Sequence, residues 1–238
     1  MYMKYMNMDT FKEKTSTVDT VIIPIGMIEA HGHHCPLGTD ILIPNKFCEI
    51  IEDKIGDKVI IAPEINYGHS WALSVYPGTI NVSTEAFTNY VKEVALGFVA
   101  NGFKNIILLN GHGGNISALR PISEAIADNN SVAVVFNWWV DFRDEILKIT
   151  EGQGHAGEDE TSAVLAIDES IVDMSKATSN EIKIKGSIYF KDFGKIIYKD
   201  ALSGDATKAS KEKGEEIYKS VSKRIIEIIS DVQKGGYC

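Results

Sequence analysis

The sequence has few of the features that mark extracellular, membrane or nucleic-acid-binding proteins. Its three cysteines, Cys35, Cys48 and Cys238, are scattered and form neither a CxxC pair nor a disulfide framework. No apolar run approaches the ~20 residues that cross a bilayer, and the N-terminal segment lacks the apolar stretch of a signal peptide. Twenty-four Lys and Arg against 33 Asp and Glu give a formal charge of −9, without a basic cluster to pair with phosphates. We expect a cytoplasmic protein that binds neither nucleic acid nor a membrane.

The chain also lacks internal repeats, low-complexity tracts and any Pro/Gly/Ser-rich linker long enough to divide it. Its 238 residues are within the range of one large domain. With 44% hydrophobic residues, the chain has enough apolar surface to build a core without disulfides. We therefore expect residues 1–238 to form a single domain.

Short apolar, β-branched runs alternate with amphipathic segments along the chain. The expected strands are residues 20–25, 58–65, 104–109 and 131–136. The expected helices are residues 44–55, 83–100, 116–128, 160–167 and 211–232. Short buried strands that alternate with helices build parallel βαβ units, so the sequence predicts an α/β fold, a three-layer α/β/α sandwich with a mostly parallel sheet. Residues 170–205 are the least regular, and we expect a hairpin at 181–193 (EIKIKG, SIYFKDF).

Histidines and carboxylates gather in three glycine-rich segments: GMIEAHGHHCPLGTD at 26–40, LNGHGGN at 109–115 and GQGHAGEDETS at 152–162. The first two follow expected strands, and chemistry in open α/β sheets lies outside the carboxyl ends of the strands. The candidate metal ligands are Glu29, His31, Asp40, His112 and Glu160. Imidazole and carboxylate ligands suit Zn²⁺ or Mn²⁺, and carboxylates can bridge two ions. The pattern predicts a metallohydrolase, with two divalent ions per chain.

Other interpretations of these residues stay open. No single spacing here is a metal-binding motif such as HExxH, and His112 in its glycine-rich turn can simply donate to a backbone carbonyl. Glu158 and Asp159 can serve the dipole at the start of a helix. A non-catalytic metal-binding or assembly protein is the main alternative. A nucleotide-binding protein would need GxGxxG or P-loop spacing, and a serine hydrolase a GxSxG elbow, none of which the chain has.

Aromatic residues near these segments are candidates for a substrate pocket. Trp138 and Trp139 directly follow an expected strand, so one side chain can line the pocket while the other packs in the core. His69 and Trp71, in the segment YGHSW, are candidate pocket residues as well.

The segments PIGMIEAHGHHCPLGTD, NGHGGN and HAGEDETS together resemble the creatininase (creatinine amidohydrolase) family, in order and at similar separations. The tail SGDATKASKEKGEE is similar to the C-terminal segment of the family, so the resemblance covers Val21 to about Glu216. It implies a three-layer α/β/α fold and a metal-dependent hydrolase of C–N amide bonds other than ordinary peptide bonds. It also implies a homo-oligomer, often a hexamer, that acts on a small molecule.

The resemblance implies Glu29 and His112 on one metal, His31 on the other, Asp40 as the bridge and His155 as the proton-transfer residue. The chain departs from creatininase at Gly114, where that enzyme has a glutamate that ligates the second metal. Either Glu160 supplies this carboxylate or the second site is weak.

The motif NGHGGN is instead similar to branches that include a formamidopyrimidine deformylase and a peptidase of mycofactocin maturation. We therefore expect a small cyclic amide, a formamide or a similar substrate, attacked by a metal-activated water. Zn²⁺ and Mn²⁺ suit the ligands, and Fe²⁺ does too.

Overall fold

The structure, a computed structural model, describes residues 1–183 and 188–236 and is built on a four-stranded parallel sheet with the strand order β2-β1-β3-β4. The strands are β1 (Thr20–Ile25), β2 (Ile60–Ile61), β3 (Asn105–Asn110) and β4 (Val132–Asn137). β1 and β3 pair over their full length, from Thr20 opposite Asn105 to Ile25 opposite Asn110. β3 and β4 pair in the same way, so three strands end at one edge of the sheet.

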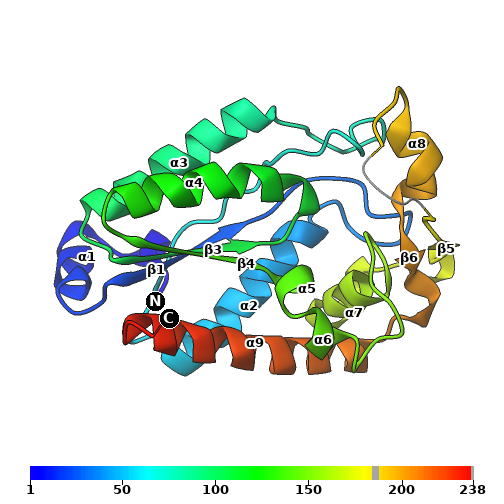
Figure 1. Cartoon of the computed structure of the whole chain (residues 1–238). Helices are drawn as coiled ribbons and strands as arrows, with labels where there is room; N and C mark the ends of the chain where they lie inside the picture. The colour runs from blue at the N-terminus through cyan, green and yellow to red at the C-terminus, as the bar shows by residue number, and fades with distance from the viewer. Residues whose placement is uncertain (184–187, 237–238) are drawn as a thin grey trace.

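Helices cover both faces of this sheet (Figure 1). The longer ones are α1 (Met8–Thr15), α2 (Thr39–Ile55), α3 (Thr84–Ala100), α4 (Ile116–Asp128), α7 (Glu158–Ile167) and α9 (Lys211–Gln233). α3 and α4 lie on one face, and α2, α7 and α9 lie on the other. Short elements complete the carboxyl-end side: α5 (Trp138–Asp141), α6 (Arg143–Ile146), α8 (Phe193–Ile197) and the antiparallel pair β5 (Ser179–Asn180) and β6 (Gly204–Asp205). The three-layer α/β/α prediction is confirmed.

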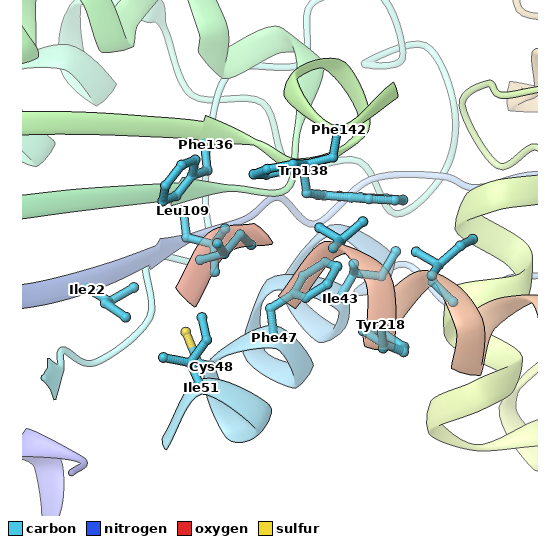
Figure 2. Close-up of a cluster of buried hydrophobic side chains, with 14 of the residues drawn as sticks. Ile22, Ile43, Phe47, Cys48, Ile51, Leu109, Phe136, Trp138, Phe142 and Tyr218 are labelled. Carbon is cyan, nitrogen blue, oxygen red and sulfur yellow. The ribbon is translucent and has the colours of Figure 1, made fainter. Parts of the chain in front are cut away.

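Alternation along β1 explains why both faces of the sheet are apolar. Val21 and Ile23 point into the core shared with α3 and α4, whereas Ile22 points into the core shared with α2 and α9. Successive side chains of a strand face opposite sides, so a strand covered on both faces has to be apolar throughout. Figure 2 shows the α2 and α9 side, where Phe47 and Tyr218 pack edge to face at 4.9 Å between ring centroids.

The predicted second strand is shorter in the structure. Instead of residues 58–65, only Ile60 and Ile61 form β2. Pro63 follows almost at once, and a proline has no N–H for the ladder of a sheet. The segment returns to the sheet only at Ile65, which makes an isolated bridge with Ile25.

Helix α2 begins at Thr39, five residues before the predicted start at Pro44. Pro44 lies inside the helix, where it cannot donate to the carbonyl of Asp40. That carbonyl packs against the backbones of Gly26 and Gly111, where an added Cβ would lie 2.7 and 2.2 Å from its oxygen. Asp40 is therefore in the first turn of a helix that presses on the ends of β1 and β3, rather than in the turn before it.

The hairpin predicted at 181–193 has its centre at residues 184–187, which lie outside the described residues. On either side, residues 181–183 and 188–192 are not in strands, and α8 begins at Phe193. The pairing that the structure shows nearby is β5 with β6, Ser179 opposite Asp205.

Among the described residues, none of the helices combines the length and the apolar character that a membrane crossing needs.

Candidate metal centre

The carboxyl edge of the sheet carries a buried cluster of histidines and carboxylates. Glu29 and His31 come from the loop after β1, and Asp40 and Glu160 from the starts of α2 and α7. His112 comes from the loop after β3, and His155 from the loop before α7. All but His155 are less than 9% exposed, so the structure brings together every predicted ligand in an environment shielded from water.

Asp40 lies at the centre of the cluster, with one oxygen on each side. Its Oδ1 is 3.0 Å from Nε2 of His31, and its Oδ2 is 2.9 Å from Nδ1 of His112. On the first side, Oε2 of Glu160 is 3.5 Å from the same Nε2 of His31. On the second side, Oε1 of Glu29 is 3.1 Å from the same Nδ1 of His112. In each of these two sets, the ligand atoms lie within 4.8 Å of one another, and Asp40 belongs to both sets.

Backbone carbonyls fix which nitrogen of each imidazole faces the cluster. Nδ1–H of His31 donates to the carbonyl of Glu29 at 3.1 Å, and Nε2–H of His112 donates to the carbonyl of His69 at 2.9 Å. A carbonyl oxygen only accepts, so the opposite nitrogen of each ring presents its lone pair to the carboxylates. Metal-bound histidines are held in this way in proteins, because the outer hydrogen bond sets the tautomer and the ring orientation.

The electrostatics of the cluster favour the binding of a cation. Burial and the neighbouring Asp40 carboxylate raise the pKa of Glu160 well above its usual value, although His31 opposes this. The pKa of His31 rises to about 9, because Asp40 outweighs the effect of burial. The pKa of His112 is also raised, since Glu29 and Asp40 outweigh burial. Three buried carboxylates therefore attract protons to the cluster unless another positive charge is present.

Unpaired carboxylate oxygens show that divalent ions fit this donor set. With His112 and His155 neutral and donating outward to backbone carbonyls, no hydrogen-bond donor among the described residues satisfies either oxygen of Glu29 or Oδ2 of Asp40, although both side chains are buried. A buried carboxylate without a partner is costly. Carboxylate oxygens and neutral imidazole nitrogens are also the donors that Zn²⁺ and Mn²⁺ accept. The residues present thus fit one or two divalent ions.

His155 lies against the cluster on the open side. Its ring centroid is 4.2 Å from that of His31, and its Nδ1 is 3.4 Å from Oε1 of Glu29. Nε2–H donates to the carbonyl of Ala30 at 2.8 Å, which leaves Nδ1 as the atom that faces inward. Burial, followed by the positive charge of His31, lowers the pKa of His155 to about 4. The ring is therefore neutral near pH 7, and its Nδ1 has a free lone pair for a metal or for a proton.

The backbone at Gly114 leaves no room for a side chain. A Cβ there would lie 1.9 Å from the carbonyl oxygen of His69 and 2.6 Å from Nε2 of His112. Asn115 holds the His69 segment in this place, because its Oδ1 accepts a hydrogen bond from the N–H of His69 at 3.0 Å. Asn115 makes this contact instead of capping α4 with its side chain. The carbonyl that orients His112 thus fills the space that a side chain would need at position 114, where the resemblance to creatininase implies a glutamate.

The loop before α7 is held by three successive acids of that helix. Glu158 accepts from the N–H groups of Glu151 and Gly152, at 2.9 and 3.1 Å, and from Nζ of Lys213 at 2.6 Å. Asp159 accepts from the N–H of Gly154 at 3.0 Å, and burial raises its pKa to about 6.

Glu160 accepts from the N–H of Ala156 at 2.7 Å and also faces His31. Sequence reasoning assigned Glu158 and Asp159 to the helix dipole, and only the structure shows that both fix the loop that carries His155.

A cavity of about 1010 Å³ opens above the cluster. Of the predicted substrate residues, His69, Trp71 and Trp139 line it. Trp138 does not, because it is fully buried and packs against Phe47 at 5.9 Å between centroids (Figure 2). Of the two adjacent tryptophans, Trp139 thus lines the pocket and Trp138 packs in the core.

Other residues of the cavity wall are not among the predicted substrate residues. Tyr189, Phe193 and Tyr198 line it from the irregular segment after β5, and Arg143 lines it from α6. The periodicity of these stretches gave no signal for a pocket, since none of them forms a long amphipathic element.

Comparison with known proteins finds one matching family and several relatives. The sequence profile of the creatininase family, described as creatinine amidohydrolase, matches residues 4–229. A 3-dehydro-scyllo-inosose hydrolase of Thermotoga maritima is 27% identical over an alignment that covers 98% of this chain and 84% of the relative. The creatinine amidohydrolase of Pseudomonas putida is 27% identical, covering 72% and 74%. A mycofactocin precursor peptide peptidase of Mycolicibacterium smegmatis is 29% identical, covering 66% and 62%.

Solved structures agree on the fold. A mutant creatininase of Zn-Zn type superposes with a TM-score of 0.86 at 22% identity, and a creatininase described as the Mn form with 0.85 at 22%. Each alignment covers 97% of both chains.

Proposed function

Because the chain belongs to the creatininase (creatinine amidohydrolase) family of hydrolases, we propose that it is a metal-dependent amidohydrolase acting on the C–N bond of a small cyclic amide, a formamide or a related substrate. The observation that carries this proposal is the position of Asp40, whose two oxygens face two separate sets of ligand atoms. The relatives differ in the substrates that their names state. We therefore assign the reaction to the buried cluster and the choice of substrate to the cavity above it.

The two ligand sets correspond to two metal positions. Glu29, Asp40 and His112 would hold one ion, and His31, Asp40 and Glu160 the other. Glu160 takes the role for which Gly114 offers no side chain. When bound, such ions polarise a carbonyl and lower the pKa of a water to near neutrality. Related creatininase structures in zinc and manganese forms support a divalent cation of this kind.

His155 is the proposed proton carrier. Its Nδ1 faces the cluster while the carbonyl of Ala30 holds Nε2–H, so the ring keeps one orientation and one tautomer. Nδ1 accepts the proton that the attacking water gives up and returns it to the leaving nitrogen. General acid–base catalysis of this kind contributes about 10²–10⁴ in rate. The loop fixed by Glu158 and Asp159 keeps His155 in position.

The cavity walls orient the substrate. Trp139 and Trp71 offer flat apolar surfaces on different segments, and His69 fixes His112 through its carbonyl. A flat amide that rests on Trp139, whose ring lies beside Gly113, presents its carbonyl to the buried cluster, and Trp71 contacts another part of the substrate.

The resemblance to creatininase also supports a homo-oligomer, a hexamer in many members, and the composition supports a cytoplasmic location. We include both in the proposal. Light scattering behind a sizing column tests the oligomeric state, and a monomer across the micromolar range would contradict it.

The metal content of the purified protein, measured beside an Asp40→Ala variant, tests the site. Asp53 on the same helix is exposed, so Asp53→Ala is the matched control. We expect close to two ions per chain in the unaltered protein and in the control, and a sharp fall in Asp40→Ala. One ion per chain would contradict the two-metal arrangement. The absence of metal after chelator-free purification would contradict the proposed hydrolase function.

Turnover of creatinine and of simple formamides, followed in parallel, selects the substrate class. His155→Ala should keep its metal and lose about 10²-fold or more in kcat. Full turnover in this variant would show that His155 does not carry the proton.

A further inference from the structure

We propose that the cavity binds an amide substrate that carries a carboxylate group, held by Arg143, and an aromatic or bulky apolar group, held by the wall of Trp71, Tyr189 and Phe193. This inference rests on the proposed amidohydrolase function and specifies its substrate. It concerns cavity-lining residues that are not candidate metal ligands.

The first observation is the size of the cavity. Its volume of about 1010 Å³ is at the upper end of the roughly 300–1,000 Å³ typical of small-molecule sites. A small cyclic amide would occupy only the region near the buried cluster. The remaining space has a defined lining of its own, so a substrate that fills it extends well beyond the bond to be cleaved.

The second observation is an aromatic wall built from two separate segments. Trp71 precedes α3, and Tyr189 and Phe193 precede and begin α8. The ring of Trp71 stacks with that of Phe193 at 5.9 Å between centroids and lies 6.0 Å from that of Tyr189. Trp71 is nevertheless 44% exposed and Tyr189 77% exposed. Exposed aromatic clusters at a cavity mark a binding surface for a flat or apolar ligand group.

The third observation is a cation that lines the cavity from another element, α6. Among the described residues that line the cavity, Arg143 is the only lysine or arginine. Its Nη1 donates to Oε1 of Gln153 at 2.7 Å, and Nε2 of Gln153 donates to the carbonyl of Trp139 at 2.9 Å. Arg143 is therefore tied to the cavity wall and to the loop that carries His155. A guanidinium has five N–H donors, so most of its donors remain for a ligand.

No carboxylate of the described residues lies within 4.0 Å of the Arg143 guanidinium in an ion pair, although acidic residues are close in sequence. Oδ2 of Asp141 instead accepts from the N–H of Asn137 at 2.7 Å, and Glu145 lies 3.6 Å from Nε of Arg224. Asp144 is the next residue in the same helical turn, and adjacent residues of a helix do not face each other. The chain has a formal charge of −9, so acidic side chains outnumber basic ones. An arginine that lines a cavity and has no acidic partner among the described residues is therefore placed to bind an anionic group of a ligand.

A carboxylate matches this position better than other anions do. The planar fork of a guanidinium binds a carboxylate through two parallel hydrogen bonds, and one guanidinium balances one singly charged group. The aromatic wall faces the same cavity, so a single molecule can bind both features while its amide reaches the cluster below. N-acylated amino acids with an aromatic or apolar group have this combination of groups.

The experiment compares two probes that differ only in charge. N-benzoylglycine has an aromatic ring, an amide and a carboxylate, and N-benzoylglycinamide replaces the carboxylate with a neutral amide. Their binding to the metal-loaded protein is measured through tryptophan fluorescence, in the unaltered protein and in Arg143→Gln. Arg120→Gln is the matched control, because Arg120 is exposed on α4 and pairs with Glu124 at 2.9 Å. Trp71→Ala tests the aromatic wall.

We expect the unaltered protein to bind the carboxylate about tenfold more tightly than the neutral probe, as a charge-assisted hydrogen bond predicts. Arg143→Gln should abolish this preference, and Arg120→Gln should keep it. Trp71→Ala should weaken both probes to the same extent.

Equal affinities in the unaltered protein, or failure to bind either probe, would overturn the proposal. A preference that survives in Arg143→Gln and disappears after chelation would place the carboxylate on the metal ions, and this too would overturn it. The readout is binding, so it stays informative even if the protein hydrolyses no amide. In that case the proposed function fails while the assignment of Arg143 is still tested.

Discussion

Gly114 allows a stringent test of how the metal centre is built, through the substitution Gly114→Ala. The backbone at this position does not have the positive φ that favours glycine, so an alanine is excluded only by contact. Its Cβ would lie 1.9 Å from the carbonyl oxygen of His69, whereas real Cβ contacts are essentially never shorter than 3.0 Å. The carbonyl must therefore retreat by about 1 Å, and it is the acceptor that orients His112.

The magnitude follows from what the displacement breaks. Losing the 2.9 Å hydrogen bond from Nε2–H of His112 releases the ring from its fixed tautomer. Loss of such an outer hydrogen bond lowers metal affinity by about 10–100-fold. Crowding in a packed region adds about 1–3 kcal/mol of destabilisation. Gly114→Glu should not restore a creatininase-like ligand, because the same carbonyl blocks its first side-chain atom.

The assay is competition with a metal-binding dye, together with urea unfolding. Gly113→Ala is the control next to it in the motif, since its Cβ would meet only the Trp139 ring, at 3.8 Å. We expect the control to keep its metal affinity and stability within a factor of about two, as for most substitutions without a steric conflict. Gly114→Ala with unaltered affinity and stability would refute the idea that the His69 carbonyl holds His112 in place.

Two further predictions concern the loop before α7 and the protons of the cluster. Glu158→Gln should destabilise the fold by about 1–3 kcal/mol in urea unfolding and lower kcat, because a neutral amide cannot replace the carboxylate that binds Lys213 and two backbone N–H groups. Glu124→Gln, on the exposed face of α4, is its control, and equal stability of the two variants would contradict the role of the loop. Metal affinity should fall at least tenfold for each unit that the pH drops below about 9, because His31, whose pKa is raised to about 9, must lose its proton before Nε2 can bind an ion, and the raised pKa of His112 makes the slope steeper. Dye competition at pH 6, 7 and 8 measures this slope, and a flat profile would show that no imidazole proton is displaced.

Much of the fold follows from local patterns. The apolar run of β1 and the helical spacing of α3, α4 and α9 were identified to within a residue or two, because burial imposes a period that neighbouring residues reveal. The start of α2 was not identified, since a proline normally marks the first turn of a helix. Pro44 is tolerated inside α2 because glycines at 26 and 111 make room for the carbonyl that it leaves without a helical partner.

The sequence by itself determined the residue types of the site and the edge of the sheet at which they gather. Glu29, His31 and His112 follow strands whose carboxyl ends meet, and this depends only on the order of strands and helices. The resemblance to creatininase already implied Asp40 as the bridge, whereas the tertiary structure alone decided that Glu160 reaches His31 and that Trp139 rather than Trp138 faces the cavity. The contact of the His69 carbonyl with His112 and the position of Arg143 in the cavity wall were likewise decided by the tertiary structure. Local spacing fixes only the direction of a side chain relative to its own backbone, whereas contacts between distant segments depend on how whole elements pack.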